Sequence, residues 1–296
     1  MLREERLWRI TQQITKERKV HCDQLAKEFG LTLASIRLDL AELERRGFAK
    51  KVYGGAVLTE PDIPPSKDNS GPLYLIEAQF SERFQIQRVE KEAIGRAAAN
   101  LINDGETIMI DGGTTTYQVC RCLADKHNLS IISDAFYNVW QELVSRSNLQ
   151  IFLTGGFLRA ESLSLVGEVA ENMLHSFRAV KSILGIDGIS IENGFTTLNF
   201  LEAGVKKRMI EASQELIIVA DHTKFGKICP IPVAPIQRAS KIVTDSGTPR
   251  DTIARLEKLG VEVIVADEVI NQMLPKQSPA ESSDLPAIPT IFSQID

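Results

Sequence analysis

The 296-residue sequence predicts an α/β protein in which a small, mostly helical domain precedes a larger domain with a mainly parallel sheet. Residues 1–58 carry apolar residues at helical spacing on both sides of a glycine turn, followed by one short alternating stretch. From residue 107 onward, short apolar runs alternate with helical patterns, which is typical of a parallel sheet with helices on both faces. The chain is long enough for two domains.

The composition is that of an ordinary globular protein, with 43% hydrophobic and 25% charged residues. No apolar run is long enough to span a membrane, and the first ten residues, MLREERLWRI, lack the apolar core of a signal peptide. Four cysteines without the spacing of a disulfide framework indicate a reducing compartment, and the four histidines stand apart without ligand spacing. We therefore expect a cytoplasmic protein that has no membrane partner, metal site or cofactor.

Composition also divides the chain into four segments. Residues 59–72 are rich in Pro, Ser, Asp and Gly and predict a linker, and the Pro- and Ser-rich residues 271–296 predict a disordered tail. Residues 1–58 and 73–270 are then the two domains. The first has 12 Lys and Arg against 8 Asp and Glu, whereas the rest of the chain has 22 against 31. A basic head on an acidic body indicates that the head meets a polyanion.

The stretch from Cys22 to Leu40 predicts two short helices joined by a tight turn. The first has an apolar face at Leu25, Ala26 and Phe29 and ends at Gly30, because only glycine takes the left-handed C-terminal conformation without steric cost. Two helices joined by a glycine turn match the DNA-binding helix-turn-helix, whose second helix enters the major groove. A generic helical hairpin is the alternative at this point.

The second helix is expected to begin after Thr32, whose hydroxyl can accept from the first exposed amides as an N-cap, and to end at Gly47. Ser35 and Arg37 point away from its buried face. The inward stripe of this helix is Ile36, Leu40 and Leu43. An earlier helix over residues 2–17 has an inward stripe of Leu7, Ile10 and Ile14.

After these helices, residues 48–53 alternate over a short strand that is broken by Gly54 and Gly55. This pattern predicts a β-wing whose basic and aromatic side chains are available to phosphates. A generic hairpin does not predict a wing, so the first domain is predicted to be a winged helix-turn-helix that binds double-stranded operator DNA. The residues expected at the DNA are Thr32, Ser35, Arg37, Leu38, Lys50, Lys51 and Tyr53.

The second domain opens with a helical pattern between residues 73 and 102. Strands are then expected at residues 107–110, 130–133, 150–153, 182–186, 216–220, 241–244 and 261–266. Helices are expected between them at residues 115–125, 136–145, 164–175, 199–213 and 248–259. Ligands of such folds bind outside the carboxyl ends of the strands, so the loops that follow the strands are the expected ligand site.

The first of these strands runs directly into Asp111, two glycines and three threonines at the start of a helix. Glycines let backbone amides approach an anion closely, and a helix N-terminus favours negative charge, so a phosphate is the expected guest. No lysine follows the glycines as in a Walker loop, and the pattern is not GxGxxG. A glycine–threonine turn that simply caps the helix is the structural alternative.

Further loops at strand ends, residues 153–157, 185–189 with 193–199, and 220–226, add carboxylates, hydroxyls and lysines at one edge of the sheet. Carboxylates suit sugar hydroxyls, whereas threonine, amide and lysine groups suit a phosphate, so a small phosphorylated sugar would use both sets. The candidate effector-binding residues are Asp111, Gly112, Gly113, Thr114, Thr115, Thr116, Gly155, Gly156, Asp187, Gly188, Thr196, Thr197, Asn199, Lys206 and Lys224.

The whole pattern resembles the DeoR family of bacterial transcriptional regulators over about residues 3–267. The head resembles the family's helix-turn-helix, with KKVYGGAV at its wing end. The second domain resembles the family's sensor domain through IDGGTTT, LTGGFLR, SLSLVGEVAE, GIDGIS, GFTTLN and VADHTKFGK. The resemblance implies a homo-oligomeric repressor of a carbohydrate catabolic operon. It also implies a sensor domain that is related in fold to sugar-phosphate isomerases and binds a phosphorylated sugar or polyol.

The chain departs from the family pattern in two places. Leu33 and Leu38 stand where the family commonly carries acidic and basic side chains, with Leu38 in place of a common arginine. Ser133-Asp134 stands where family members often carry an asparagine–serine pair. On a helix expected to face DNA, Leu33 and Leu38 either pack against the rest of the head or meet thymine methyl groups in the groove. Packing is the expectation for Leu33, and both alternatives are open for Leu38.

A DNA-binding repressor released by a phosphorylated sugar or polyol, without enzymatic activity, is the expected function. The alternative is a sugar-phosphate isomerase-like enzyme with an appended DNA-binding head, for which Asp187 and Glu202 are candidate bases. Glu202 and Lys206 are four residues apart on one expected helix, so an ion pair between them is the simpler interpretation of both. An architectural DNA-binding protein would leave the glycine–threonine loops unexplained.

Overall fold

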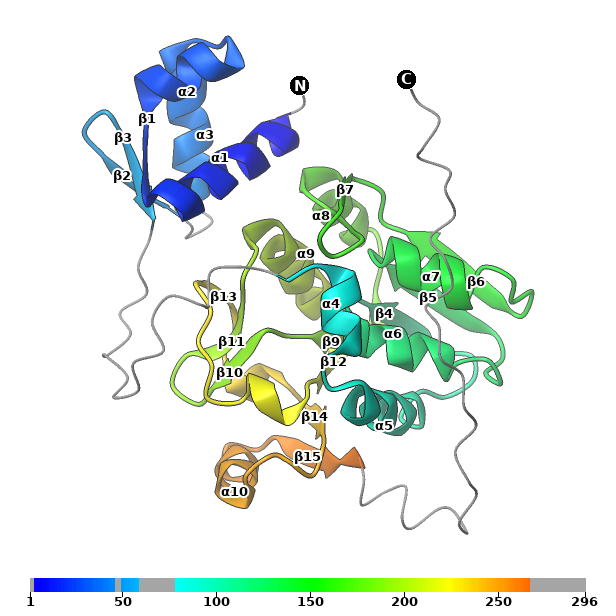
Figure 1. Cartoon of the computed structure of the whole chain (residues 1–296). Helices are drawn as coiled ribbons and strands as arrows, with labels where there is room; N and C mark the ends of the chain where they lie inside the picture. Colours follow the sequence, from blue (N-terminus) through cyan, green and yellow to red (C-terminus); the bar gives the residue numbers. More distant parts are fainter. Residues whose placement is uncertain (1–2, 46–48, 59–77, 267–296) are drawn as a thin grey trace.

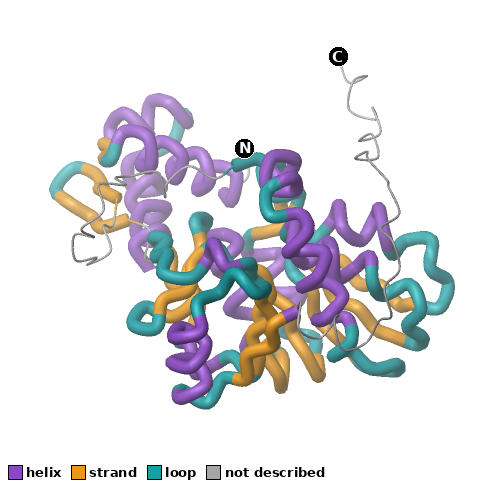
Figure 2. The backbone as a smooth tube through the Cα atoms, turned by 60° about the horizontal axis from the view of Figure 1, so that its bottom comes forward, coloured by secondary structure: helices purple, strands orange, loops and turns teal. Residues whose placement is uncertain are grey.

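The computed structural model describes residues 3–45, 49–58 and 78–266. The expected linker and the expected C-terminal tail lie outside these residues. Figure 1 shows the N-terminal head, in blue, above the end of the larger domain that carries α8 and α9. The larger domain has a central sheet with helices around it, as the strands and helices of Figure 2 show. The predicted order of a helix-turn-helix head and an α/β domain is confirmed.

Within residues 3–45 and 49–58, the head has three helices and a three-stranded antiparallel sheet of order β1-β3-β2. The helices are α1 (Arg3–Glu17), α2 (Cys22–Phe29) and α3 (Leu33–Arg45). The strands are β1 (Lys19–His21), β2 (Ala49–Val52) and β3 (Gly55–Leu58). Both predicted inward stripes are buried, with side chains of Leu7, Ile10, Ile14, Ile36, Leu40 and Leu43 at most 1% exposed. The strand before α2, which pairs with the wing, was missed by the sequence prediction.

The turn between α2 and α3 forms as the sequence predicts. Gly30 is left-handed, with φ 64°, and the amide of Leu31 donates to the carbonyl of Ala26 at 3.0 Å. The hydroxyl of Thr32 accepts from the amide of Ser35 at 3.2 Å, so Thr32 caps α3. These two caps set the angle at which α3 leaves the turn.

The larger domain is built on a seven-stranded parallel sheet of order β15-β14-β12-β9-β4-β5-β6. Its strands are β4 (Thr107–Ile110), β5 (Leu129–Ser133), β6 (Leu149–Leu153), β9 (Ala179–Gly185), β12 (Ser213–Val219), β14 (Lys241–Thr244) and β15 (Glu262–Val265). All seven expected strands are present, two of them with the expected bounds.

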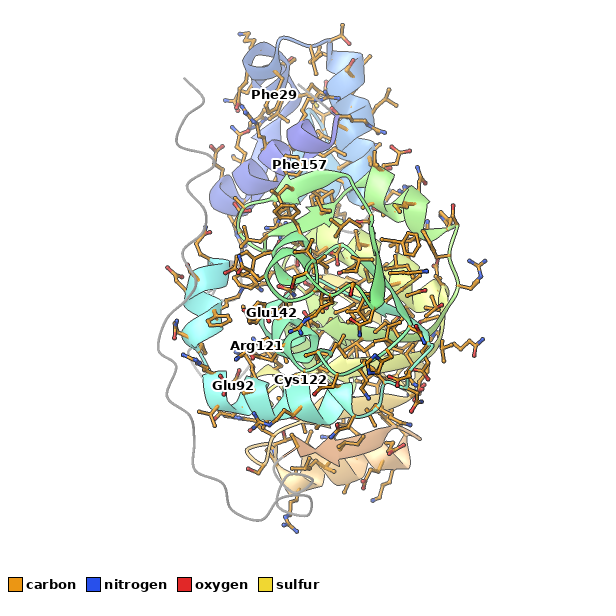
Figure 3. All side chains as sticks on the ribbon, turned by 90° about the vertical axis from the view of Figure 1, so that its right-hand side faces the viewer. Phe29, Glu92, Arg121, Cys122, Glu142 and Phe157 are labelled. Carbon is orange, nitrogen blue, oxygen red and sulfur yellow. The ribbon has the colours of Figure 1, made fainter. Side chains whose placement is uncertain are left out.

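Each face of the sheet has its own apolar core, because successive side chains of a strand point to opposite faces. On β4, Ile108 and Ile110 belong to one core and Met109 to the other. The helices that supply the first core are α5 (Arg88–Ala99), α6 (Thr114–Arg121) and α7 (Phe136–Glu142). Those that supply the second are α8 (Glu168–Leu174), α9 (Phe200–Glu211) and α10 (Arg250–Lys258). Figure 3 shows Glu92, Arg121 and Cys122 together where α5 packs on α6.

Small antiparallel strands correct the sequence prediction at two places. The expected helix over residues 164–175 starts with a strand, β8 (Ser164–Val166), which pairs with β7 (Phe157–Arg159) before α8 begins. The expected loop over residues 193–199 contains β11 (Gly194–Thr197), which pairs with β10 (Gly188–Ser190) and β13 (Ile231–Ala234). These strands are three or four residues long, too short for a periodicity to reveal.

The helical pattern predicted between residues 73 and 102 is two helices within the described residues. A short helix, α4 (Phe80–Gln85), is separated from α5 by Gln87 in the left-handed conformation, with φ 51°. Phe80 and Phe84 pack on Tyr117 of α6, which holds α4 beside the N-terminal part of that helix. The break turns the end of α4 toward the carboxyl edge of the sheet.

Candidate functional site

A pocket lies at the carboxyl ends of β4 and β9, in the position that the fold predicts. Its floor is the loop after β4 and the start of α6. Gly112 admits no side chain, because a Cβ there would lie 2.6 Å from the Cβ of Ser164. The first amides of α6 have no acceptor within the helix and carry the positive end of its dipole. The residues that line the pocket are Arg83, Ile86, Lys91, Gly112, Gly113, Thr114, Thr115, Gly185, Ile186, Asp187, Glu202, Lys206 and Lys224.

Four cationic side chains converge on this pocket from different parts of the chain. Arg83 and Lys91 come from α4 and α5, Lys206 comes from α9, and Lys224 comes from the short 3₁₀ helix His222–Lys224 after β12. Lys91 is 4% exposed, and its Nζ donates to the carbonyls of Arg83 and Ile86, each at 2.6 Å. Burial lowers the pKa of Lys91 to about 8.

Lys206 is fixed beneath the pocket by a buried ion pair. Its Nζ donates to the carboxylate of Asp111, which is fully buried, and to the carbonyl of Gly185 at 3.1 Å. The other carboxylate oxygen of Asp111 accepts from the amide of Gly185 at 3.0 Å. Burial acts to lower the pKa of Lys206, but the negative charges of Asp111 and Glu202 outweigh it and raise that pKa. Lys206 therefore stays charged.

Two carboxylates also line the pocket. Asp187 accepts from the hydroxyl of Thr197 at 2.6 Å and from the amide of Leu198 at 3.2 Å. Burial acts to raise the pKa of Asp187, but the charges of Arg83 and Lys224 together with the bond from Thr197 hold it below its ordinary value. Asp187 is thus an anion whose position is set by its neighbours.

Glu202 corrects one interpretation of the sequence. Its carboxylate pairs with the buried guanidinium of Arg159 on β7, and Lys206 pairs with Asp111, so neither makes the expected ion pair with the other. Burial acts to raise the pKa of Glu202, but Arg159 and Lys206 bring it below its ordinary value. The two ion pairs join residues 43 and 95 positions apart, and no helical spacing predicts them.

A fourth carboxylate of the site, Asp134, lies buried behind the glycine loop. It is 3% exposed and accepts from the amide of Gly112 at 2.9 Å. Burial and the nearby charge of Asp111 raise the pKa of Asp134 well above its ordinary value. Asp134 belongs to the second of the two departures from the family pattern, and it fixes the backbone of the pocket floor.

The remaining expected effector residues support the pocket or lie outside it. Thr116 donates to the carbonyl of Gly113 at 3.0 Å, and Asn199 caps α9 by accepting from the amides of Leu201 and Glu202. Thr196 donates to the carbonyl of Gly188 at 3.3 Å, within the small antiparallel sheet. The two glycines after β6, Gly155 and Gly156, lie beside β8 and α8 rather than in the pocket lining.

Sequence reasoning missed the contribution of α4 and α5 to the pocket. Arg83, Ile86 and Lys91 fall in the stretch that was interpreted only as a helix. One signal was available: Lys91 lies three and seven residues before Ile94 and Ala98, on the buried stripe of α5. Because lysine is almost never fully buried unless it is paired, a lysine on such a stripe indicates a buried charge with a specific function.

The head carries a groove between α3 and the turn of the wing. It is lined by Cys22, Asp23, Leu33, Arg37, Leu40, Lys51, Val52, Tyr53, Gly54 and Gly55. Arg37, Lys51 and Tyr53 of the expected DNA-contacting residues meet there, and Tyr53 is fully exposed. Lys50 is exposed on β2, while the hydroxyls of Thr32 and Ser35 bond to each other at 3.0 Å at the start of α3. A basic groove beside the second helix fits a DNA backbone and groove edge.

Two further properties concern only the part of the chain that the structure describes. None of its helices is both long and apolar enough to cross a membrane. Within the same residues, no group of three or more His, Cys, Asp and Glu side chains has a geometry that could hold a metal ion.

A head with a helix-turn-helix groove and a second domain with a pocket lined by four cationic side chains are the features of a DNA-binding regulator with a sensor domain. The family model of the DeoR-like helix-turn-helix domain matches residues 6–62, and that of the DeoR C-terminal sensor domain matches residues 86–246. The chain belongs to the DeoR family of transcriptional regulators.

Relatives of known name agree with this assignment. The transcriptional repressor AccR of Agrobacterium fabrum is 32% identical over 266 residues, which are 89% of this chain and 98% of that protein. The glycerol-3-phosphate regulon repressor of Escherichia coli K12 is 30% identical over 240 residues, 81% of this chain and 90% of that protein. These relatives are transcriptional regulators, which favours the regulator over the isomerase-like alternative.

Among solved structures, ribose 5-phosphate isomerase A from Neisseria gonorrhoeae is similar in fold to part of the chain. The TM-score is 0.32 with 16% identity, over 46% of this chain and 52% of that one. A likeness at this level says nothing about ligand or activity.

Proposed function

We propose that this regulator represses a carbohydrate catabolic operon and that a phosphorylated sugar or polyol, bound in the pocket of the second domain, weakens its hold on operator DNA. The observation that carries the proposal is that cationic side chains, helix N-terminal amides and two carboxylates line one pocket together. The regulator acts on DNA, and we expect it to work in the cytoplasm as a homo-oligomer, since helix-turn-helix proteins commonly bind paired half-sites as dimers.

The cationic side chains and the helix N-terminal amides of the pocket suit a phosphate group. The amides of residues 113–115 open α6, and Lys91, Arg83 and Lys224 add positive charge around them. A phosphate dianion accepts hydrogen bonds from amides and hydroxyls and gains from each nearby cation.

The carboxylates of the pocket suit hydroxyl groups. Asp187 and Glu202 are ionised and can each accept a hydrogen bond from a sugar or polyol hydroxyl. A ligand with a phosphate at one end and hydroxyls along its chain would form hydrogen bonds with both the cationic groups and the carboxylates. The name of the glycerol-3-phosphate regulon repressor is in keeping with this class of effector.

The same carboxylates argue for binding rather than isomerisation. A general base works best when its pKa lies near the operating pH. The pKa values of Asp187 and Glu202 lie below their ordinary range, and Glu202 forms an ion pair with Arg159. Neither group has the environment that makes a carboxylate a strong base.

The helix α9 provides a route from the pocket to the head. Lys206 on one side of α9 lines the pocket, while Lys207 and Glu211 on another side share a cleft with Arg45 at the end of α3. Glu171 of α8 is close enough for its charge to act on both Arg45 and Lys207. A ligand that prefers one position of α9 would therefore bias the end of the recognition helix.

A thermal-shift screen tests the effector class. We expect a phosphorylated sugar or polyol to raise the melting temperature of the full chain, because a ligand that binds only the folded state stabilises it. The matched controls are the same compound without its phosphate and inorganic phosphate alone. If the unphosphorylated compound raises the melting temperature as much as its phosphate does, the proposed phosphate site is contradicted.

Lys91 predicts how effector binding depends on pH. Its pKa is about 8, and only its charged form attracts a phosphate, so the fraction charged falls as the pH rises through 8. Binding of the best sugar phosphate from the screen should weaken about tenfold between pH 7 and pH 9, where the phosphate stays a dianion. Isothermal titration across this range measures it.

The variants Lys91→Met and Lys126→Met make a matched pair for this test. Each lysine donates to backbone carbonyls, but only Lys91 lines the pocket. Lys91→Met should bind more weakly at pH 7 and lose the pH dependence, and Lys126→Met should behave as the wild type. A Lys91→Met protein with the wild-type pH dependence would exclude Lys91 as its source.

A further inference from the structure

Leu38 lies exposed in the middle of the recognition helix. Its side chain is 67% exposed on α3, whose buried face carries Ile36, Leu40 and Leu43. Ala34 and Ala41 lie four residues before and three after it, so the three form one apolar line along the helix. The structure thus excludes packing within the head for Leu38, whereas Leu33 is only 38% exposed and lines the groove beside Arg37.

An exposed leucine between two alanines gives this helix face a particular chemistry. Its short neighbours let the helix backbone approach a flat surface closely, and Leu38 offers no donor or acceptor to a base or a phosphate. The side of the same helix that carries Arg37 supplies positive charge together with Lys51 of the wing. This positive charge attracts the helix to DNA, and the apolar line then faces the base edges in the groove.

We infer that Leu38 reads thymine by contact with its 5-methyl group in the major groove. Among the four bases only thymine presents a methyl group there, and apolar side chains contact it where polar side chains read the other bases. Leu38 thus acts as a specificity-determining residue that favours operator sites with thymine facing the centre of α3. This inference rests on DNA binding by the head and not on the sensor pocket.

The test replaces thymine by deoxyuridine, which removes the methyl group and keeps the base pair. The probe is a duplex that the wild-type full-length chain selects from a random 30-base-pair library, with single thymines replaced in turn. For the wild type, replacing the single thymine that faces Leu38 in one half-site should weaken binding about three- to fivefold, the value expected for one buried methyl group. Fluorescence anisotropy measures the affinities.

The variant Leu38→Ala tests whether the response to deoxyuridine depends on Leu38. It should bind the thymine probe more weakly and lose the response to deoxyuridine at that position, while Leu38→Met, which keeps an apolar contact, should retain part of it. Val144→Ala, a change at an exposed valine of the sensor domain, is the control and should respond as the wild type.

Three outcomes would overturn the inference. The first is a Leu38→Ala protein with the same deoxyuridine response as the wild type. The second is a selected operator in which no thymine replacement matters. The third is a change in oligomeric state for Leu38→Ala, seen by sedimentation, with the thymine preference intact, which would assign Leu38 to contacts between copies of the chain.

Discussion

Replacing Lys206 by methionine should lower the free energy of unfolding by about 3–5 kcal/mol, the usual cost of removing one partner of a buried ion pair. The change leaves the buried carboxylate of Asp111 without its cation, while the hydrogen bond from the amide of Gly185 remains. Lys206 also lines the pocket, so the variant should lose its response to a sugar phosphate. Urea unfolding of the full chain and the thermal-shift screen measure the two effects.

The surface lysine Lys241 supplies the control for this change. It bridges Glu215 and Glu262 in a half-exposed position, and Lys241→Met should cost only about 0–1 kcal/mol. The double variant Asp111→Asn with Lys206→Met removes both charges and should recover part of the lost stability. Equal unfolding midpoints for Lys206→Met and Lys241→Met would show that the buried pair does not hold the pocket together.

Replacing Arg37 by alanine should weaken operator binding about 5- to 150-fold, because a well-placed arginine in the major groove contributes about 1–3 kcal/mol of discrimination. Arg37 is exposed on α3 and lines the groove with Lys51 and Tyr53. Anisotropy titrations with the selected operator and with a scrambled duplex measure specific and non-specific binding separately. The loss should be larger for the operator.

Arg255 is a matched arginine at a distance from the head. It is exposed on α10 and pairs with Glu192 at 3.1 Å. Arg255→Ala should leave operator binding unchanged. If Arg37→Ala and Arg255→Ala bind the operator equally well, Arg37 does not contact the bases.

The parallel sheet could be predicted from the sequence because buried strands leave local signals. The strands Thr107–Ile110 and Lys241–Thr244 appear with the predicted bounds, since each is a short apolar run between a polar turn and a helix start. The helix-turn-helix was equally visible, because Gly30 and Thr32 mark its turn through their own backbone and hydroxyl chemistry. Such signals lie within a few residues of the structure that they specify.

The parts that could not be predicted depend on partners far away in the sequence. The strand Ser164–Val166 exists because it pairs with Phe157–Arg159, and Gly167, with φ 94°, then separates it from α8. Its three residues fit a helical pattern as well as a strand.

The site divides in the same way. The loop after β4 and the lysines Lys206 and Lys224 could be placed at one sheet edge from the fold alone. The partners of Lys206 and Glu202 could not, because their ion pairs join the loop after β4 to α9 and β7 to α9. Arg83 reaches the pocket only because the aromatic contacts of α4 with α6 turn that helix toward it.

The measurement that tests the account most directly is operator affinity of the full chain with and without the sugar or polyol phosphate that gives the largest thermal shift. We predict that this compound weakens operator binding about 5- to 150-fold, the range of a coupling energy of about 1–3 kcal/mol, and that its unphosphorylated counterpart does not. Lys206→Met should show no such response. If no phosphorylated sugar or polyol changes the operator affinity of the wild-type protein, the pocket does not control the head and the proposed function is wrong.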